Sequence, residues 1–282
     1  MSKKKAVLRC KDHLVSGDEF ELHPHPKFDI LETRPVPENL SFYYESEDYI
    51  SHTDSSGSLT DKIYRLVKSY MLQKKLSWIL EIKKEGTILD LGAGTGDFLL
   101  KAKKNGWTTS GVEPNVSARA LAEKKGIRLK KNSSEFSSSY FDVISMWHVL
   151  EHVPDLDAQL TELDRLLKED GMLVIAVPNY KSHDAQYYGE DWAAYDVPRH
   201  LWHFSQEGIT ALFAERGFSL QKIEPLKFDS FYVSLLSEQH RSGRKNLIKA
   251  FFEGLRSNWS ARATSEYSSL VYFFKRALKT RF

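Results

Sequence analysis

The sequence predicts an α/β fold in which helices cover both faces of a mostly parallel, doubly wound sheet. Amphipathic helical patterns alternate with short apolar runs along the middle of the chain. Strands that are apolar throughout and alternate with such helices are typical of a parallel sheet covered on both sides. The four clearest runs, each with the length of a buried strand, are residues 87–91, 108–112, 141–146 and 172–177.

Local signals define the helices and the end of the sheet. Gly171 ends the clearest helical pattern, because glycine is a common helix stop. Beyond Gly217, residues 218–224 and 230–236 have the pattern of two strands joined by a short link, so we expect a terminal antiparallel hairpin. The apolar positions of the clearest helix are Leu156, Leu160, Leu163 and Leu167.

The chain divides into three regions. Residues 1–58 contain short alternating stretches and turn signals, which indicate a small β-rich piece. Residues 59–237 hold the α/β pattern. Residues 238–282 form a basic helical extension, in which ten Lys and Arg and two Glu after residue 238 give a charge of +8 (10 − 2). This extension could lie on an anionic membrane surface or pack on the core with its basic face in water, and we expect the second.

Composition narrows the class of protein. The 282 residues carry a net charge of +2, so we expect no nucleic-acid partner. Cys10 is the single cysteine, which rules out an internal disulfide and fits a reducing compartment. The chain shows no signal peptide and no apolar run of the roughly 18 residues that a membrane-spanning helix needs. We therefore expect a cytoplasmic protein.

A glycine-rich turn follows the first predicted strand. Residues 89–96 read Leu-Asp-Leu-Gly-Ala-Gly-Thr-Gly, and glycines there permit sharp turns and let a ligand approach the backbone. A dinucleotide fingerprint would need a further glycine where this chain has Asp97. Glu113 ends the second strand, where a carboxylate can accept both hydroxyls of a ribose. The pattern indicates a nucleoside site and disfavours a dinucleotide.

These segments together resemble the motifs of class I S-adenosylmethionine-dependent methyltransferases, in the ubiquinone-biosynthesis-like, type 23 branch. The resemblance covers about residues 60–236. It implies a Rossmann-like sheet of seven strands and S-adenosylmethionine as the cofactor. The matching segments, in chain order, are residues 89–96, 111–113, 141–144, 148–155 and 171–179.

The resemblance also implies how the cofactor is held. Glu113 would bind the adenosyl ribose, and the backbone from Gly92 to Gly96 would pass under the methionine part. Residues 132–135 would flank the adenine, although the aspartate that is common there is absent. The expected cofactor contacts are Tyr44, Asp90, Gly92, Ala93, Gly94, Gly96, Glu113, Pro114, Ser133, Ser134, Trp147 and His148.

The acceptor side is expected beyond the strand at residues 172–177. If the methyl group goes to a hydroxyl, a base must remove its proton, and His200 is the candidate. Arg199 could hold an anionic group of the substrate. Alternatively, His200 and His203 only fix their loop against the domain.

A metal site is an open alternative after the strand at residues 141–146. His148, Glu151 and His152 share one helix face by their spacing, and such a set can bind a metal ion. The same segment can instead form a wall of the cofactor site. We expect the wall, and no metal.

The N-terminal piece resembles a zinc-ribbon segment found on some sugar- and glycan-linked methyltransferases. Those have two Cys-x-x-Cys pairs, whereas this chain has only Cys10, so we expect a metal-free piece that serves as a lid or substrate wall. Its aromatic end could cap the cofactor with ring faces or simply dock the piece on the core. The residues concerned are Tyr43, Tyr44, Tyr49 and His52.

The sequence thus predicts a methyltransferase that acts on a small-molecule, sugar- or glycan-linked, or lipid-linked acceptor, with oxygen as the accepting atom. Two alternatives remain, a non-catalytic relative that binds a partner and an NAD-dependent dehydrogenase. Peripheral membrane contact, if present, would run through the basic extension.

Overall fold

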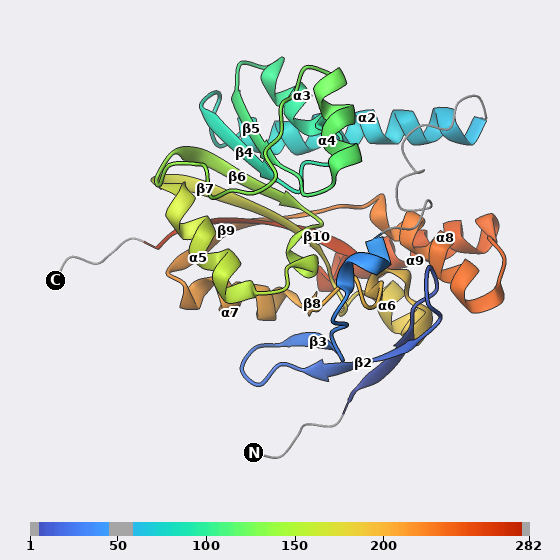
Figure 1. Ribbon diagram of the computed structural model, residues 1–282. Coiled ribbons are helices and arrows are strands. Elements are labelled where there is room, and N and C mark those ends of the chain that lie inside the picture. The colour runs from blue at the N-terminus through green and yellow to red at the C-terminus, as the bar shows by residue number, and fades with distance from the viewer. Residues whose placement is uncertain (1–5, 45–58, 278–282) are drawn as a thin grey trace.

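Two sheets organise the computed structural model, which describes residues 6–44 and 59–277, with only the backbone for residues 59–64 (Figure 1). In the described residues the larger sheet has six strands, in the order β5-β4-β6-β7-β10-β9. These strands are β4 (Thr87–Leu91), β5 (Thr108–Val112), β6 (Phe141–Trp147), β7 (Leu167–Pro178), β9 (Phe218–Pro225) and β10 (Ser269–Arg276).

All neighbours in the larger sheet are parallel except those of β10. β4 pairs in parallel with β5 and β6, and β6 pairs in parallel with β7. β10 runs antiparallel to both β7 and β9, so β9 has the direction of the other strands. The carboxyl ends of the parallel strands therefore meet at one edge, where open α/β sheets bind their ligands.

Helices cover both faces of this sheet, because strand side chains alternate between the two faces. α2, α3 and α4 pack on the face that carries Ile88 and Val143, whereas α5 and α7 pack on the face of Leu89 and Ile144. Figure 1 shows the two groups on opposite sides of the sheet, which confirms the predicted fold class. The helices are α2 (Leu59–Leu80), α3 (Asp97–Lys103), α4 (Val116–Lys124), α5 (Leu156–Leu166) and α7 (Gln206–Glu215).

The N-terminal piece forms a smaller sheet with one strand from the α/β core. Its order is β1-β2-β3-β8, and all neighbours are antiparallel. The pairing of β3 with β8 places this piece beside the loop of His200, which directly precedes β8. The expected β-rich character is confirmed for residues 6–44, while Tyr49 and His52 lie outside the described residues. The strands are β1 (Leu8–Lys11), β2 (Glu19–Pro24), β3 (Ile30–Arg34) and β8 (Trp202–Phe204).

The prediction of a strand at residues 230–236 is wrong, because these residues lie in helix α8 (Asp229–Ser242). Ser230, Val233, Ser234 and Ser237 are buried with helical spacing. Three of the four are serines, so the buried stripe does not register as an apolar pattern. The antiparallel partner of β9 is β10.

The extension after residue 238 is helical only in part. α9 (Leu247–Thr264) is the expected helix, but β10 lies inside the larger sheet between β7 and β9. A domain boundary at residue 237 would therefore separate β10 from the sheet to which it belongs. The apolar cluster from Leu270 to Phe274 is buried throughout, and a short run of that kind does not distinguish a strand from a helix in sequence.

The implied seventh strand is reduced to an isolated bridge. Val112 of β5 pairs in parallel with Lys130, beyond the edge of the sheet. The polar residues that follow favour a loop, so the described residues give six strands and one bridge. The remaining short elements are η1 (Leu40–Tyr44), η2 (Leu150–His152), α6 (His183–Tyr188), η3 (Gly189–Asp191) and η4 (Ala193–Tyr195).

Candidate active site

The glycine-rich turn directly follows β4 and leads into α3. Gly92, Gly94 and Gly96 have positive φ angles of 69°, 53° and 74°, which glycine adopts without strain. A Cβ atom at Gly92 would lie 2.4 Å from Cγ2 of Val149, so the turn also packs closely against the segment after β6. The predicted turn is therefore held between two strand ends.

The carboxylate of Glu113 lies against this turn. Its Oε2 accepts a hydrogen bond from the N–H of Gly94 at 2.9 Å, and its Oε1 accepts one from the N–H of Asn115 at 2.8 Å. The N–H of Ala93 donates to the carbonyl of Val112, also at 2.9 Å. Acid and turn thus meet at the carboxyl ends of β4 and β5, as a ribose-binding carboxylate requires.

Open space borders the turn on the side where a ligand would approach. A Cβ atom built at Gly94 meets nothing within 4 Å in the described part of the chain. Pro114 follows Glu113, and its carbonyl accepts a hydrogen bond from the Arg119 guanidinium at 2.7 Å, which fixes the chain after the carboxylate. Bare backbone beside an anchored carboxylate fits a nucleoside ligand.

Asp90 lies within the sheet, just before the turn. Its carboxylate is 2% exposed and accepts a hydrogen bond from the Ser145 hydroxyl at 2.6 Å. Burial raises the pKa of Asp90 to about 7, although the hydrogen bond from Ser145 and the charge of Lys75 act in the opposite direction. Asp90 therefore braces β4 against β6 below the predicted site.

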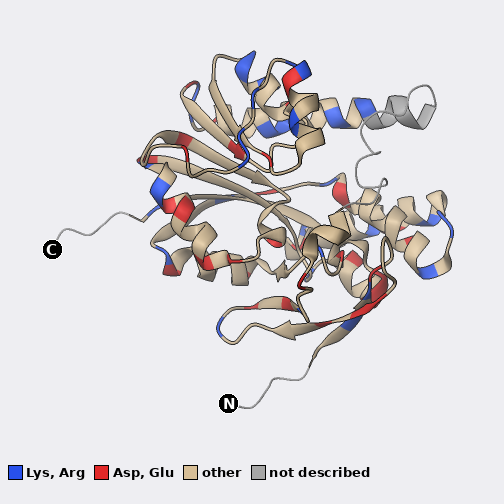
Figure 2. Ribbon diagram, in the orientation of Figure 1, with Lys and Arg blue, Asp and Glu red and all other residues tan. Residues whose placement is uncertain are grey.

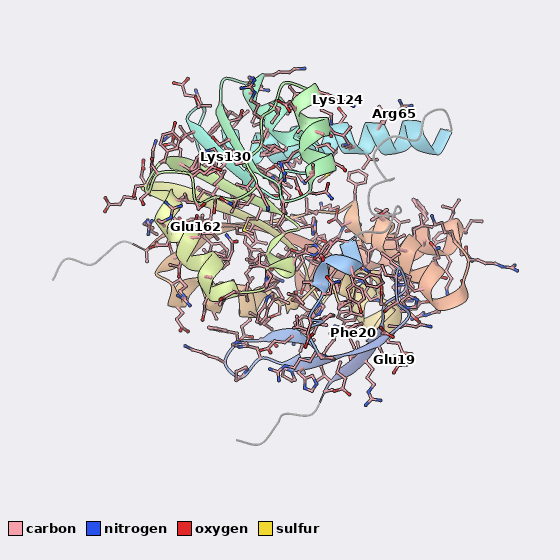
Figure 3. The ribbon with its side chains drawn as sticks, viewed as in Figure 1. Glu19, Phe20, Arg65, Lys124, Lys130 and Glu162 are labelled. Carbon is pink, nitrogen blue, oxygen red and sulfur yellow. The ribbon has the colours of Figure 1, made fainter. Side chains whose placement is uncertain are left out.

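The loop expected to flank the adenine starts beside Glu113. The N–H of Glu113 donates to the carbonyl of Lys130 at 2.9 Å. Further along, the Ser133 hydroxyl donates to Glu162 of α5 at 2.6 Å, which ties the loop to the sheet's other face. Figure 3 labels Lys130 and Glu162 near this loop. Ser134 donates to Asn132 within the loop at 2.6 Å.

Trp147 ends β6 next to α3, and His148 directly follows the strand. The Trp147 ring meets Phe98 of α3 edge-on, with ring centroids 5.4 Å apart. Its Nε1 is buried and has no hydrogen-bond partner among the described residues. The Nζ of Lys75 lies 4.4 Å from the centroid of the Trp147 ring.

His148 bridges two carboxylates. Its Nδ1 lies 3.3 Å from Oε1 of Glu151, and its Nε2 lies 3.0 Å from Oδ2 of Asp229, the first residue of α8. Burial acts to lower the pKa of His148, but the hydrogen bonds to Asp229 and Glu151 outweigh it and raise the pKa to about 9. The ring is therefore a cation near neutral pH.

A second polar cluster joins the segment after β6 to the loop before β8. One ligand atom each from Glu151, His152 and His200 lie within 4.8 Å of one another. Nδ1 of His200 lies 2.8 Å from the carbonyl of Ala194, and Nδ1 of His152 lies 3.1 Å from that of Arg199. Because a carbonyl only accepts hydrogen bonds, we assign the proton of each neutral ring to Nδ1 and the lone pair to Nε2.

The carboxylate of Glu151 completes this cluster. It is fully buried, and its Oε2 has no hydrogen-bond partner among the described residues. Burial acts to raise the pKa of Glu151, but the hydrogen bond from His148 lowers it. Burial and the neighbouring His200 lower the pKa of His152 to about 4. Glu151, His152 and His200 together can bind a metal ion or accept a proton. The sequence suggested His148 as a member of this cluster, whereas the structure has His200 in its place.

Arg199 is not available to a substrate, which corrects its predicted role. Its side chain is 1% exposed, and its guanidinium forms ion pairs with Asp196 at 2.6 Å and Asp12 at 3.2 Å. A third contact, with the carbonyl of Tyr43, is 3.4 Å long. A guanidinium with two carboxylates around it is already neutralised, so Arg199 fastens the N-terminal piece to the loop of His200.

Tyr44 and His203 also connect these two parts. The Tyr44 hydroxyl lies 3.1 Å from Nδ1 of His152 and donates to the carbonyl of Arg199 at 3.2 Å. His203 is buried, and its Nε2 lies 2.9 Å from the Thr33 hydroxyl of β3. Tyr44 thus sits at the Glu151–His152–His200 cluster, while His203 fixes β8 to the N-terminal sheet.

Comparison with known proteins decides which cofactor this site serves. A family model of a methyltransferase domain matches residues 64–223, more than half of the chain. The chain belongs to this methyltransferase family. It is a class I S-adenosylmethionine-dependent methyltransferase, as the strand-end motifs predict.

Relatives of the methyltransferase include quinone-modifying enzymes. The demethylmenaquinone methyltransferase of Chlorobaculum tepidum is 26% identical over 67% of this chain and 86% of its own length. An uncharacterised protein of Methanocaldococcus jannaschii is 26% identical over 77% of this chain and 94% of its own length. A ubiquinone biosynthesis O-methyltransferase of Actinobacillus pleuropneumoniae is 31% identical, over 33% of this chain and 45% of its own length.

Solved structures show the same fold. The magnesium protoporphyrin IX methyltransferase of Synechocystis, solved with bound S-adenosylhomocysteine, has a TM-score of 0.55 and 13% identity over 83% of this chain and 97% of its own. The geranyl diphosphate C-methyltransferase of Streptomyces coelicolor has a TM-score of 0.53 and 15% identity over 86% of this chain and 90% of its own. At these identities the likeness concerns the fold alone.

One residue, Asp97, argues against the binding of a dinucleotide by this methyltransferase. Asp97, at the position of the missing glycine, begins α3 and forms ion pairs with Lys68 at 2.7 Å and Lys125 at 2.6 Å. A carboxylate in the first turn of this helix would repel a pyrophosphate bound at the helix N-terminus. The two lysines are committed to Asp97, so they do not replace the missing phosphate contacts.

Two charged groups near the methyltransferase site escaped sequence reasoning. Asp229 reaches His148 from α8, and Lys75 of α2 reaches the ring of Trp147. Burial lowers the pKa of Lys75, against the charges of Asp229 and Asp90. Neither residue belongs to a motif, and Asp229 begins a helix that the sequence pattern presents as a strand.

Proposed function

We propose that the methyltransferase transfers its methyl group to a hydroxyl of a small-molecule, sugar- or glycan-linked, or lipid-linked acceptor. When bound, S-adenosylmethionine supplies an electrophilic methyl group on a sulfonium. The observation that carries the proposal is the ring of His200, which is anchored by Nδ1 and leaves Nε2 among buried polar groups. In this proposal Nε2 accepts the hydroxyl proton during an in-line displacement.

The cofactor side of the proposal assigns a part to each contact. Glu113 accepts the ribose hydroxyls, and Pro114, Ser133 and Ser134 border the adenine. The backbone from Gly92 through Ala93 and Gly94 to Gly96 passes under the methionine part, with Asp90 below it. Trp147, whose buried Nε1 has no partner among the residues that the structure describes, walls the opposite side. His148 lies beside Trp147, at the start of the acceptor side.

The neighbours of His200 hold the base in place. Asp196 Oδ2 lies 3.9 Å from Nε2 of His200, and the His152 ring meets the His200 ring edge-on with centroids 4.5 Å apart. The Thr33 hydroxyl donates to the backbone carbonyl of His200 at 2.6 Å. Such a buried, fixed imidazole excludes water and loses little freedom when an acceptor binds.

Relatives support a lipid-linked acceptor within this range. Several of them are named for quinones, among them a demethylmenaquinone methyltransferase and a ubiquinone biosynthesis O-methyltransferase. Others are named as C-methyltransferases, so carbon is the second candidate for the accepting atom. A phenolic ring offers both atoms, because removal of the hydroxyl proton activates the oxygen and the ring carbon beside it.

Methyl transfer from labelled S-adenosylmethionine tests the proposal directly. The probes are a catechol with a prenyl chain and demethylmenaquinol, and NMR of the product shows whether the label is on oxygen or carbon. We expect an O-methyl product and a fall of about 100-fold in kcat for His200→Gln at unchanged cofactor affinity. The matched control is His240→Gln, which lies against His13 of the N-terminal piece. A carbon product, or full activity of His200→Gln, would overturn this assignment.

A further inference from the structure

We propose that helix α9 is a peripheral docking surface for anionic lipid bilayers. The helix exposes large apolar side chains and buries small ones, which reverses the ordinary arrangement of a helix on a protein surface. The buried stripe consists of Ala250, Gly254, Ser257 and Ala261. The exposed apolar residues, between 43% and 73% accessible, are Leu247, Ile248, Phe251, Phe252, Leu255 and Trp259.

These apolar residues share one face of α9. At 100° per residue, their positions fall within an arc of roughly 140° that points away from the buried stripe. Phe251 and Phe252 have ring centroids 5.9 Å apart, and Phe251 also meets Phe231 of α8 at 5.5 Å. A contiguous apolar surface of this kind marks an interaction site, whereas a single exposed apolar residue does not. We call this face the α9 apolar face.

The orientation of α9 is fixed, so its apolar face cannot turn inward. A Cβ atom at Gly254 would lie 2.7 Å from Cδ1 of Phe231, which shows how closely α9 approaches α8. The Ser257 hydroxyl donates to the buried Asp184 at 2.6 Å, and the Asn258 amide donates to the carbonyl of Lys227 at 2.9 Å. Figure 1 shows α8 and α9 side by side at one edge of the molecule.

Positive charge surrounds this apolar face. Arg244, Lys245, Arg256 and Arg262 are exposed, and Glu253 is the single acidic residue of α9. The guanidinium of Arg262 lies 5.1 Å from the Trp259 ring. Blue segments on the α8–α9 edge in Figure 2 mark basic residues there. Basic residues beside a Trp/Phe/Leu face are the composition of helices that lie in the headgroup region of anionic membranes.

The charge also argues against a second copy of the chain as the occupant. A symmetric dimer through the α9 apolar face would bring the same basic residues of both copies together, with one glutamate on each helix to offset them. An anionic bilayer instead complements both the charge and the apolar side chains. Contact would be peripheral, since no helix in the described part of the chain is long and apolar enough to cross a bilayer.

Two further exposed aromatic rings lie together beside the methyltransferase site. Phe228 and Tyr70, both exposed, have ring centroids 5.7 Å apart, and Phe228 immediately precedes Asp229. Asp229 contacts His148 of the site at 3.0 Å. A membrane-bound acceptor would therefore leave the bilayer beside the site. Docking through α9 does not depend on the proposed acceptor.

Vesicle flotation of the full-length protein tests the proposal. The vesicles are phosphatidylcholine alone, or with about 30 mol% phosphatidylglycerol, which supplies the anionic surface. We expect the protein to float with the anionic vesicles, and about 0.5 M salt to weaken this binding. The double substitution Phe252→Glu and Trp259→Glu is expected to reduce partitioning about tenfold or more.

Controls separate lipid docking from other causes. Val116→Glu removes a similarly exposed apolar residue, on α4, and is expected to float as the unsubstituted protein does. Circular dichroism and cofactor binding of the double variant check that its fold is intact. The proposal is overturned if the unsubstituted protein does not float, or if the double variant floats equally well. It is also overturned if sedimentation shows a dimer that the double variant converts to a monomer.

Discussion

The carboxylate of Glu113 and the N–H of Gly94 are joined by a 2.9 Å hydrogen bond across the carboxyl ends of β4 and β5. This contact brings together the acid and the glycine turn that the sequence places 19 residues apart. A ribose bound here would take its hydroxyl contacts from the same carboxylate. The relationship is the basis of the first two predictions.

Glu113→Gln is expected to weaken binding of S-adenosylhomocysteine by about tenfold or more, because two charge-assisted hydrogen bonds become neutral ones. Isothermal titration calorimetry measures the change. Glu123→Gln, on the exposed end of α4, is the matched control and should leave affinity unchanged. Equal affinity of Glu113→Gln and the control would remove the ribose assignment.

Gly94→Ala tests whether the open space at the turn belongs to the cofactor. Gly94 and Gly106 both have positive φ, and at either position an added Cβ meets no atom of the described residues within 4 Å. Both substitutions should therefore cost about 1–2 kcal/mol of unfolding free energy through backbone strain alone. Gly94→Ala alone should also abolish the rise in melting temperature that the cofactor produces. A similar cofactor response in both variants would show that the space is not used.

Strand ends were the most predictable part of this molecule. The runs at residues 87–91 and 108–112 coincide with β4 and β5. β4 is buried along almost its whole length, whereas β5, at the edge of the sheet, is buried only at Gly111 and Val112. The contact of Gly94 with Glu113 then follows from the rule that parallel strands place their ends side by side. The strand at residues 269–276 and the helix over residues 230–236 were less predictable. The first buries a continuous apolar run and the second buries mostly small polar side chains, so neither shows a distinct hydrophobic period.

Long-range polar pairing accounts for what the sequence did not reveal. Arg199 pairs with Asp12, 187 residues away, and His148 pairs with Asp229, 81 residues away. A local pattern shows only that a charged residue is present. It does not show whether the charge is neutralised inside the protein or left for a substrate, which is why Arg199 was misjudged.

Arg199→Lys is expected to destabilise the fold more than it changes acceptor recognition. The guanidinium satisfies both Asp12 and Asp196, and a lysine cannot reproduce this forked geometry in a buried site. We expect a loss of about 2–4 kcal/mol in unfolding free energy, measured by urea denaturation. The KM for the acceptor should stay within about twofold of the original, because the guanidinium is buried in ion pairs with Asp12 and Asp196. A large rise in KM at unchanged stability would restore the substrate-binding role.

His148 should make stability depend on pH. Its pKa rises from 6.5 to about 9 in the folded protein. Burial acts to lower this pKa, but the hydrogen bonds to Asp229 and Glu151 outweigh it. The folded state therefore binds this proton more tightly, so the stabilisation is complete below pH 6.5 and is lost as pH rises through about 9. In Asp229→Asn, the unfolding free energy lost over this pH range should be smaller by about 1 kcal/mol. This figure is reduced for solvent screening of the ion pair.

Urea denaturation across this pH range measures the effect. The unfolding free energies of the original protein and of Asp229→Asn should converge as the imidazolium loses its proton. The control is Asp170→Asn, which changes an exposed carboxylate on β7. Asp155→Asn is not suitable, because the Asp155 side chain caps α5. A constant difference between the two proteins at all pH values would show that the ion pair with His148 does not form.

Chelation should leave methyl transfer unchanged within about twofold, because the negative charge of Glu151 is already offset by the His148 cation. Glu151, His152 and His200 are nevertheless close enough to hold an ion, so the test is a demanding one. Turnover is measured after dialysis against EDTA, and again after addition of Mg²⁺ or Zn²⁺. Glu151→Gln is the companion variant, since it keeps the shape of the side chain while removing its charge. If EDTA abolished turnover and one metal restored it in the original protein but not in Glu151→Gln, the cluster would be a metal site, and His200 would be a ligand instead of the base.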